Sequence, residues 1–352
     1  MDMRFNKFLL GLAVLSTTTA FAQVNKMGEL GKALYNKGKY DSAIVVLSQG
    51  LKINAYDANL YFYRANAENQ LKKYDEALED YALAYKYDPK NELILINRGN
   101  LKVELKKYAE ALVDYSKALE INPKSAEAYH FRGSAYDYIN RFTEALNDYN
   151  MALKLEPKNS MFYDNRGTTK MNLKQFEGAM ADFDMAIKLN PKNASAYNNR
   201  GALKNEQKHH EEAIKDYDIA ISINPQSAKA FNNRGRAKDD LKKFNEAIAD
   251  YNTALKLDPN NSKAYNNRGI SKLELKKYKD ALADFLKSIS LDKDNPIPYN
   301  NAGFAYLKLN NGKKAIENYD MAKKIGGNGY VPHKEYRDLA VKLVAEDKQN
   351  KK

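Results

Sequence analysis

Apolar residues recur at three- and four-residue spacing along most of the chain, which is the pattern of amphipathic helices. One such stretch holds Ala111, Leu112, Tyr115, Ala118 and Leu119, which fall on one side of a helix. Prolines interrupt the pattern at regular distances, and a proline cannot continue a helix. The pattern therefore predicts an all-α protein made of many short helices, each with one apolar face.

The helical pattern repeats every 34 residues. When the chain is divided into blocks from Val24, block position 20 is Ala nine times, position 8 is Gly or Ala nine times, and position 32 is Pro in six blocks. The nine blocks are 24–57, 58–91, 92–125, 126–159, 160–193, 194–227, 228–261, 262–295 and 296–329. Because a single helix pair cannot bury its apolar face, this period predicts repeats that stack on one another.

Each block is expected to contain two helices, A and B. Position 34 is Asn or Ser in most blocks, and these side chains accept hydrogen bonds from the free N–H groups at the start of a helix. A Lys-Lys-Tyr or similar sequence near positions 15–17 marks the turn between helices A and B. Small residues at positions 8, 20 and 27 are expected to let helices approach closely, while aromatic residues at positions 4, 17 and 24 fill the remaining space.

Small residues at positions 8, 20 and 27, aromatic residues at 4 and 24, and Pro at 32 resemble the tetratricopeptide repeat, over residues 24–329. The resemblance implies a right-handed α-solenoid of nine helix-turn-helix repeats, with helix A of each repeat lining a concave groove. Position 4 carries Tyr or Phe where the family usually has Trp, and position 7 carries Arg where Leu is usual. The amphipathic stretch 330–347 is expected to be a C-terminal capping helix, and 348–352 a disordered basic tail.

Arginine at position 7 and aspartate at position 23 occur in the same blocks, the second to the eighth. The first block has Leu30 and Val46 instead, and the last has Ala302 and Asn318. Because the two residue types appear and vanish together, we predict that they pair between helix A and helix B as a forked guanidinium–carboxylate contact.

Candidate binding residues follow from the groove that the resemblance implies, which positions 2, 5, 6, 9, 12 and 13 would line. A side-chain amide both donates and accepts hydrogen bonds, so a row of asparagines can match an extended peptide backbone. Aromatic surfaces at the N-terminal end are typical of binding hot spots. The alternative is that the amides only solvate the helices or bond to neighbouring helices, and that the aromatic rings pack internally. The candidates are Asn97, Asn165, Asn199, Asn233, Asn267, Asn301, Asn198, Asn232, Asn266, Asn300, Phe62, Tyr63 and Phe131.

The amino-acid composition excludes several classes of function. The chain has no cysteine, which excludes thiol catalysis, disulfides and cysteine zinc sites. Its four histidines form no metal-spaced motif, so we predict no metal, no cofactor and no catalytic residue. A net charge of +12 makes nucleic-acid binding the alternative function. Because acids are interspersed with the bases, the sequence favours a scaffold that binds a protein or an extended peptide, and it supports an enzyme least.

The N-terminus has the pattern of a secretory signal peptide over residues 1–22. Arg4 and Lys7 precede an apolar run at 8–15, and Ala20-Phe21-Ala22 is a small-x-small cleavage site. We therefore expect an exported protein, periplasmic or secreted and of Gram-negative bacterial type. No transmembrane span is expected to remain after cleavage, because the apolar run is too short for one.

Overall fold

The computed structural model describes residues 21–327 and 334–349, and the described residues form helices without any strand. The chain divides into two compact units, Met1–Gln175 (unit 1) and Phe176–Lys352 (unit 2). The predicted signal peptide falls almost entirely on residues 1–20, which lie outside the described residues.

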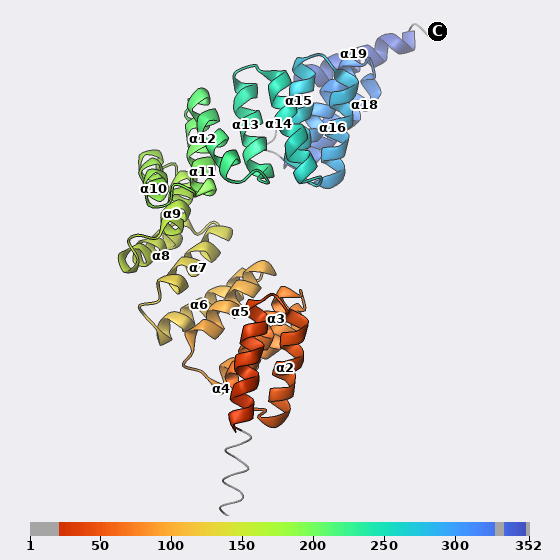
Figure 1. Cartoon of the computed structure of the whole chain (residues 1–352). Coiled ribbons are helices and arrows are strands. Elements are labelled where there is room, and N and C mark those ends of the chain that lie inside the picture. Colours follow the sequence, from red (N-terminus) through yellow and green to blue (C-terminus); the bar gives the residue numbers. More distant parts are fainter. Residues whose placement is uncertain (1–20, 328–333, 350–352) are drawn as a thin grey trace, which may run out of the picture. The chain divides into compact units, whose positions relative to one another are not determined.

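Each unit is a series of helical hairpins, and within a unit each hairpin packs on the next (Figure 1). Unit 1 contains a helix over residues 21–36 followed by α2 (Tyr40–Ile53), α3 (Ala58–Gln70), α4 (Tyr74–Tyr87), α5 (Glu92–Glu104), α6 (Tyr108–Ile121), α7 (Ala126–Tyr138), α8 (Phe142–Leu155) and α9 (Ser160–Asn172). Unit 2 contains α10 (Phe176–Leu189), α11 (Ala194–Glu206), α12 (His210–Ile223), α13 (Ala228–Asp240), α14 (Phe244–Leu257), α15 (Ser262–Glu274), α16 (Tyr278–Leu291), α17 (Pro296–Lys308), α18 (Gly312–Gly326) and α19 (Lys334–Gln349). The helix over 21–36 and the odd-numbered helices α3 to α17 are the A helices of the repeats, and the even-numbered ones are the B helices.

The A helices begin where the sequence predicts. In α5, Asn91 Oδ1 accepts a hydrogen bond from the Leu93 N–H at 3.2 Å. The same type of side-chain cap starts every A helix from α3 to α17, given by Asp57, Asn91, Ser125, Asn159, Asn193, Ser227, Asn261 and Asn295. The capping role of position 34 is therefore confirmed.

Glycine at position 8 lets an aromatic ring from helix B lie against the backbone of helix A. A Cβ atom on Gly99 would come within 2.6 Å of the Tyr115 ring, and one on Gly235 within 2.8 Å of the Tyr251 ring. Both rings are fully buried. The second repeat accommodates alanine here, as Ala65 against Tyr81, whereas a residue larger than alanine would push the two helices of the hairpin apart.

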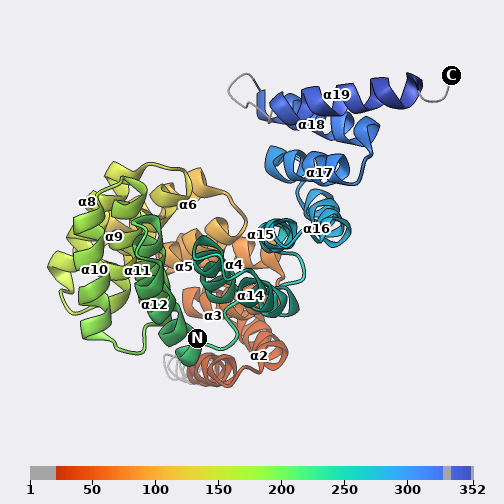
Figure 2. The ribbon, with the colours of Figure 1, turned by 90° about the horizontal axis from the view of Figure 1, so that it is seen from above.

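The last hairpin is covered by α19, which contacts both α17 and α18 (Figure 2). Ala340 is buried in a cluster with Leu307 and Tyr319, and the Tyr336 ring lies 4.8 Å from that of Phe304. The helix continues through residues 348 and 349, where the sequence predicts the start of a tail. Residues 330–333 and 350–352 lie outside the described residues.

The turn between helices A and B has one residue in the left-handed region in each of the nine repeats. Position 15 has φ between 58° and 66° at eight non-glycine residues, and Gly38 has φ of 71° in the first repeat. At Lys242, the backbone N–H donates to the Asp239 carbonyl at 2.8 Å, which closes the end of α13. Glycine adopts this conformation without steric cost, whereas lysine does not.

Replacing Lys208, Lys242 and Lys276 together with glycine is therefore expected to stabilise unit 2. The left-handed conformation costs an L-residue about 1–2 kcal/mol, and glycine gives back about 0.5–1 kcal/mol through the greater entropy of the unfolded chain. We expect the free energy of unfolding in urea to rise by about 0.5–1 kcal/mol at each site, and therefore by about 1.5–3 kcal/mol in total. Lys215→Gly, at an exposed position inside α12, is the control and should lower it by about 1 kcal/mol. An unchanged or lower stability of the triple variant would contradict the strained turn.

Candidate functional site

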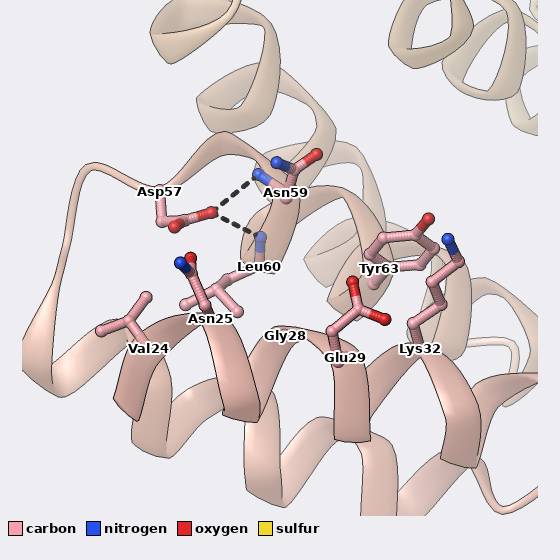
Figure 3. A pocket seen from close by; sticks show the side chains of 9 residues that line it. All are labelled: Val24, Asn25, Gly28, Glu29, Lys32, Asp57, Asn59, Leu60 and Tyr63. Atoms are coloured by element: carbon pink, nitrogen blue, oxygen red, sulfur yellow. Dashed lines mark hydrogen bonds between the residues drawn. The ribbon is translucent and has the colours of Figure 1, made fainter. Parts of the chain in front are cut away.

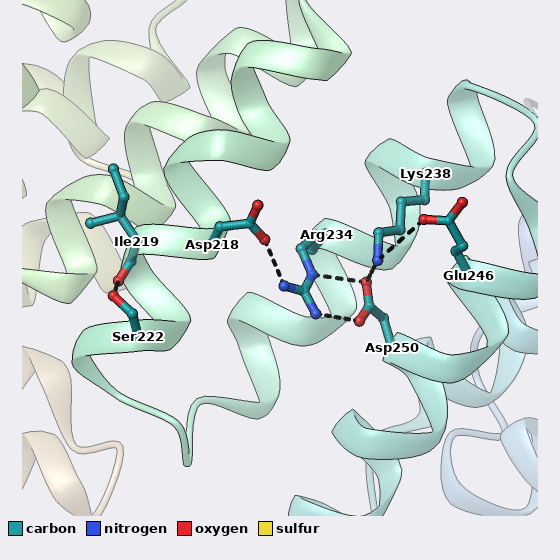
Figure 4. Close-up of polar contacts among 7 residues, drawn as sticks. All are labelled: Asp218, Ile219, Ser222, Arg234, Lys238, Glu246 and Asp250. Atoms are coloured by element: carbon teal, nitrogen blue, oxygen red, sulfur yellow. Dashed lines mark hydrogen bonds and ion pairs between the residues drawn. The ribbon is translucent and has the colours of Figure 1, made fainter.

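An arginine at position 7 joins three helices. In the repeat of α13 and α14, Arg234 Nε and Nη2 donate to Asp250 Oδ2 and Oδ1 at 3.0 and 2.6 Å. Arg234 Nη1 donates to Asp218 Oδ1 on α12, the B helix of the preceding repeat, at 2.6 Å (Figure 4). The predicted pairing between helices A and B is confirmed. The additional link to the preceding repeat was not predicted.

The same forked pair recurs through both units. The aspartates are between 1% and 5% exposed, and the hydrogen bonds are 2.6 to 2.9 Å long. The pairs are Arg64–Asp80, Arg98–Asp114, Arg132–Asp148, Arg200–Asp216 and Arg268–Asp284. Because a buried carboxylate without a cation is costly, each arginine is a structural requirement of its repeat.

A lysine at position 11 shares the buried aspartate. Lys238 Nζ lies 2.9 Å from Asp250 Oδ2, as Figure 4 shows. Equivalent contacts of 2.7 to 3.0 Å are Lys102–Asp114, Lys204–Asp216 and Lys272–Asp284. Two cations one helical turn apart repel weakly, and the shared carboxylate offsets this repulsion. Six arginines and four lysines thus point at buried carboxylates, which reduces the basic surface available to a polyanion.

The second repeat carries an acid, Glu68, in place of this lysine. Its Oε1 lies 3.8 Å from Arg64 Nε, and its Oε2 is buried without a hydrogen-bond partner. Burial first, and the negative charge of Asp80 second, raise the pKa of Glu68 to about 8. This carboxyl group is therefore largely protonated at neutral pH.

The predicted asparagines of unit 2 bond to one another from one repeat to the next. In each bond, the Nδ2 atom of a position-6 asparagine donates to the Oδ1 atom of the position-5 asparagine in the preceding repeat. The bonds are Asn233 to Asn198 at 3.0 Å, Asn267 to Asn232 at 3.2 Å and Asn301 to Asn266 at 2.9 Å. We call Asn198, Asn199, Asn232, Asn233, Asn266, Asn267, Asn300 and Asn301 the amide row. Its lateral bonds tie neighbouring A helices together.

A lateral bond uses only part of the hydrogen-bonding capacity of an amide. An asparagine amide donates two hydrogen bonds and accepts two, and each lateral bond uses one donor and one acceptor. Asn199 shows the additional contacts that such an amide makes. Its Nδ2 donates to Ser195 Oγ at 3.3 Å, and its Oδ1 accepts from Lys229 Nζ at 3.3 Å. Asn198, Asn266 and Asn300 are buried, while the other members are half-buried.

In unit 1 the same positional relation joins an asparagine to a histidine. Asn165 Nδ2 donates to His130 Nε2 at 2.6 Å. The His130 ring stacks on Phe162 with centroids 4.7 Å apart, and its Nδ1 is buried without a partner. Burial lowers the pKa of His130 to about 4, so the imidazole is neutral at pH 7. Asn97, the other predicted asparagine of unit 1, is half-buried on α5.

The three predicted aromatic residues differ in exposure. Phe62 is 9% exposed and belongs to the core cluster of its repeat, in contact with Tyr81. Tyr63 and Phe131 are half-buried. The Tyr63 ring packs edge-on against Phe62 at 5.3 Å, and the Lys32 ammonium lies 5.6 Å from its centroid. Tyr63 and Phe131 therefore keep exposed ring surface.

A second polar link between repeats was not predicted. Asp239 on α13 accepts a hydrogen bond from Tyr251 OH at 2.7 Å and from Ser271 Oγ of the next repeat at 2.7 Å. Burial raises the pKa of Asp239 to about 6. The equivalent set in unit 1 is Asp137, Tyr149 and Thr169. The sequence holds a signal for it, because Asp at position 12 occurs only where the next block has Thr or Ser at position 10.

Two negative findings apply to residues 21–327 and 334–349. No group of three or more His, Asp or Glu side chains is placed to hold a metal ion. No helix in these ranges is both long enough and apolar enough to cross a membrane.

Arg132→Met is expected to lower the free energy of unfolding by about 3–5 kcal/mol, because it leaves the buried Asp148 carboxylate without a cation. Tyr136 stands at position 11 of this repeat, so no lysine compensates. The double variant Arg132→Met/Asp148→Leu should lose less than the single variant in urea denaturation. Arg141→Met, which removes an exposed pair with Glu144, is the control and should cost less than about 1 kcal/mol. A double variant with a lower free energy of unfolding than Arg132→Met would contradict the conclusion that the unpaired carboxylate causes the loss.

The neutral state of His130 predicts a dependence of stability on acid. The pKa of His130 in the folded state, about 4, lies below the ordinary value of 6.5. The neutral ring therefore contributes fully to the free energy of unfolding above pH 6.5, and this contribution is lost as the pH falls toward 4. Between pH 7 and pH 5 the loss should reach about 2 kcal/mol. His130→Asn, which copies position 5 of the later repeats, should remove this loss. Urea denaturation of both proteins at the two pH values measures it, and equal losses would refute the assignment.

Comparison with known proteins agrees with the repeat geometry. Models described as tetratricopeptide repeat or TPR repeat match residues 29–92, 99–137, 126–159, 167–207, 194–227, 228–261, 250–283 and 271–310. No curated protein was found to match the sequence.

Solved structures show the same fold. The Cut9–Hcn1 hetero-tetramer of APC/C aligns with a TM-score of 0.62 and 17% identity, over 76% of this chain and 52% of that one. The chain thus spans about half the length of that relative. A tetratricopeptide repeat protein from Parabacteroides merdae aligns with a TM-score of 0.59 and 23% identity, over 70% of this chain and 98% of that one. The chain belongs to the tetratricopeptide repeat family, whose fold supports a role as a protein–protein interaction scaffold.

Proposed function

We propose that the protein binds an extended polypeptide segment along the amide row of unit 2, mainly through the main chain of that segment. The observation that carries the proposal is the regular succession of amides, one pair on each A helix from α11 to α17, with at least one half-buried member in every pair. A peptide main chain presents alternating N–H and C=O groups, and a carboxamide can both donate to and accept from it. Lateral bonding between the amides holds them in place before a ligand arrives, which lowers the entropic cost of binding.

Charged side chains flank the amide row and offer selectivity for the side chains of the ligand. Lys229 and Lys263 are exposed at position 2, toward the start of the A helices. Glu206 and Glu274 are exposed at position 13, toward their ends. Successive side chains of an extended segment point to opposite sides. A segment with acids on one side and bases on the other would therefore complement both flanks.

The proposal includes export from the cytoplasm. It rests on the basic residues, the apolar run and the small-x-small site at residues 1–22. In an envelope or extracellular setting, a protein held together by packing and ion pairs, without a cysteine, needs no disulfide formation to fold.

The main-chain part of the proposal is tested with peptides selected by display of random dodecapeptides on the immobilised protein. We expect that selected peptides bind about tenfold more weakly when their central amides are N-methylated, since a methyl group removes the donor. The triple variant Asn199→Ala/Asn233→Ala/Asn267→Ala should bind the unmodified peptides more weakly by a similar factor. Fluorescence anisotropy measures this affinity at a temperature where circular dichroism shows the variant folded.

The matched control is Asn245→Ala/Asn260→Ala, which removes two exposed asparagines of unit 2 outside the amide row and should leave binding unchanged. Binding that tolerates N-methylation and the triple substitution would reject main-chain recognition by the amide row, while the repeat fold would stand.

A further inference from the structure

A pocket opens between the helix over 21–36 and α3, near the N-terminal end of unit 1 (Figure 3). Its volume is about 380 Å³. The residues that define its chemistry are Gly28, Glu29 and Lys32 on the first helix and Asp57, Leu60 and Tyr63 at the start of the second repeat. In Figure 3, the side chains of Glu29 and Lys32 point from the first helix toward the side on which Tyr63 lies. The pocket belongs to unit 1 alone and is separate from the amide row.

The pocket exists because one side chain is missing. Gly28 occupies position 5, where every later repeat carries a side chain, from Phe62 in the second repeat to Asn300 in the last. In unit 2 the position-5 side chain reaches position 6 of the next repeat, as Asn198 reaches Asn233. A Cβ atom on Gly28 would meet Leu60 Cδ2 at 3.4 Å, which is an ordinary contact. A larger residue can therefore fill the gap without moving the backbone.

The lining suits a cation on an apolar stem. Leu60 is 1% exposed and Val24 2% exposed, so apolar side chains lie beneath a lining whose exposed surface is mainly polar. Glu29 and Asp57 bring two carboxylates against the single ammonium group of Lys32. Asp57 Oδ1 accepts from the backbone N–H of residues 59 and 60 at 3.0 and 3.1 Å, which leaves its second oxygen for other donors. The net charge of these three side chains is therefore −1.

Lys32 already occupies the place of such a cation. Its ammonium lies 5.6 Å from the Tyr63 centroid, within the range of a cation–π contact. The interaction with Tyr63, chiefly hydrogen bonding, and then the negative charge of Glu29 raise the pKa of Lys32. Because the Lys32 side chain is exposed, a competing cation can displace it at little cost.

Guanidinium groups use aromatic faces throughout this protein. The Arg64 guanidinium lies 5.5 Å from the Tyr61 centroid, and that of Arg132 lies 5.7 Å from the Tyr129 centroid. A guanidinium stacks on a ring and also forks to a carboxylate, whereas an ammonium is a compact point charge that holds its water more strongly. The combination of Tyr63 and Glu29 therefore fits arginine better than lysine.

We propose that this pocket binds an arginine side chain of a partner polypeptide. The guanidinium stacks on Tyr63 in place of Lys32 and donates to the Glu29 carboxylate, while the aliphatic stem covers Gly28 and Leu60. The proposal does not depend on peptide binding by the amide row.

The test is a titration with N-acetyl-L-arginine amide, followed through the leucine methyl signals of the protein by NMR. We expect saturable shifts of the Leu60 methyl signals with arginine amide. N-acetyl-L-citrulline amide, which has the same shape without the charge, should bind at least about threefold more weakly. Glu29→Gln should weaken arginine amide binding by about threefold, and Lys32→Ala should strengthen it by about the same factor because the internal competitor is gone.

Gly28→Asn is the blocking control, since it places the asparagine of repeats six to nine in the gap. This variant should give no saturable shift with arginine amide. Circular dichroism must first show that it melts at the same temperature as the wild-type protein. Equal binding of arginine and citrulline amides, weaker binding by Lys32→Ala, or unchanged binding by a folded Gly28→Asn variant would each overturn the proposal. None of these results bears on the amide row, which lies in unit 2.

Discussion

The buried aspartate at position 23 is the constraint on which the helical hairpins of the second to eighth repeats depend. A carboxylate this deeply buried is tolerated only with a cation and hydrogen bonds. Arginine at position 7 supplies two of those bonds from helix A of the same hairpin, and its third nitrogen reaches helix B of the preceding repeat, as from Arg234 to Asp218. Arg98 shows that this third link is not required, because it makes both bonds to Asp114 although Ala82 stands at the acceptor position of the preceding repeat. The first and last repeats omit both the arginine and the aspartate, so the two residues are kept or lost together.

The different roles of the arginine–aspartate pair and of the acceptor on the preceding repeat explain which positions vary between repeats. The aspartate and the arginine each have a single geometry to satisfy, so their identities stay fixed from the second to the eighth repeat. The acceptor on the preceding repeat is more exposed and needs only an oxygen. Ser48, Asn150 and Asp184 all fill that role, for Arg64, Arg166 and Arg200 respectively. Variation at this position therefore reflects loose geometry and says little about function.

The contacts that could be predicted from the sequence are those between residues of the same repeat. The caps of the A helices, the glycine beneath the aromatic ring and the arginine–aspartate pair are of this kind, because the geometry of one helix or of one hairpin brings their atoms together. The lateral bond from Asn233 to Asn198 and the link from Ser271 to Asp239 join different repeats, 35 and 32 residues apart. Their partners are set by the offset between neighbouring A helices, which the hydrophobic period does not specify. Correlation between positions of successive blocks was the signal available for both.

Departures from the repeat pattern carry more information once these structural roles are known. The amide row follows its own lateral bonding, so its regularity alone does not require a ligand, and a function in binding depends on the capacity that the lateral bonds leave unused. The first two repeats are different, because Gly28 and Glu68 stand where other repeats have side chains that complete a contact. Gly28 leaves open space, and Glu68 leaves a buried oxygen without a partner. Each loses packing or electrostatic stabilisation that a residue already used elsewhere in the chain would provide. At Gly28 the missing side chain leaves a pocket open to solvent, and a departure of this kind from the local pattern is expected at the arginine site proposed above.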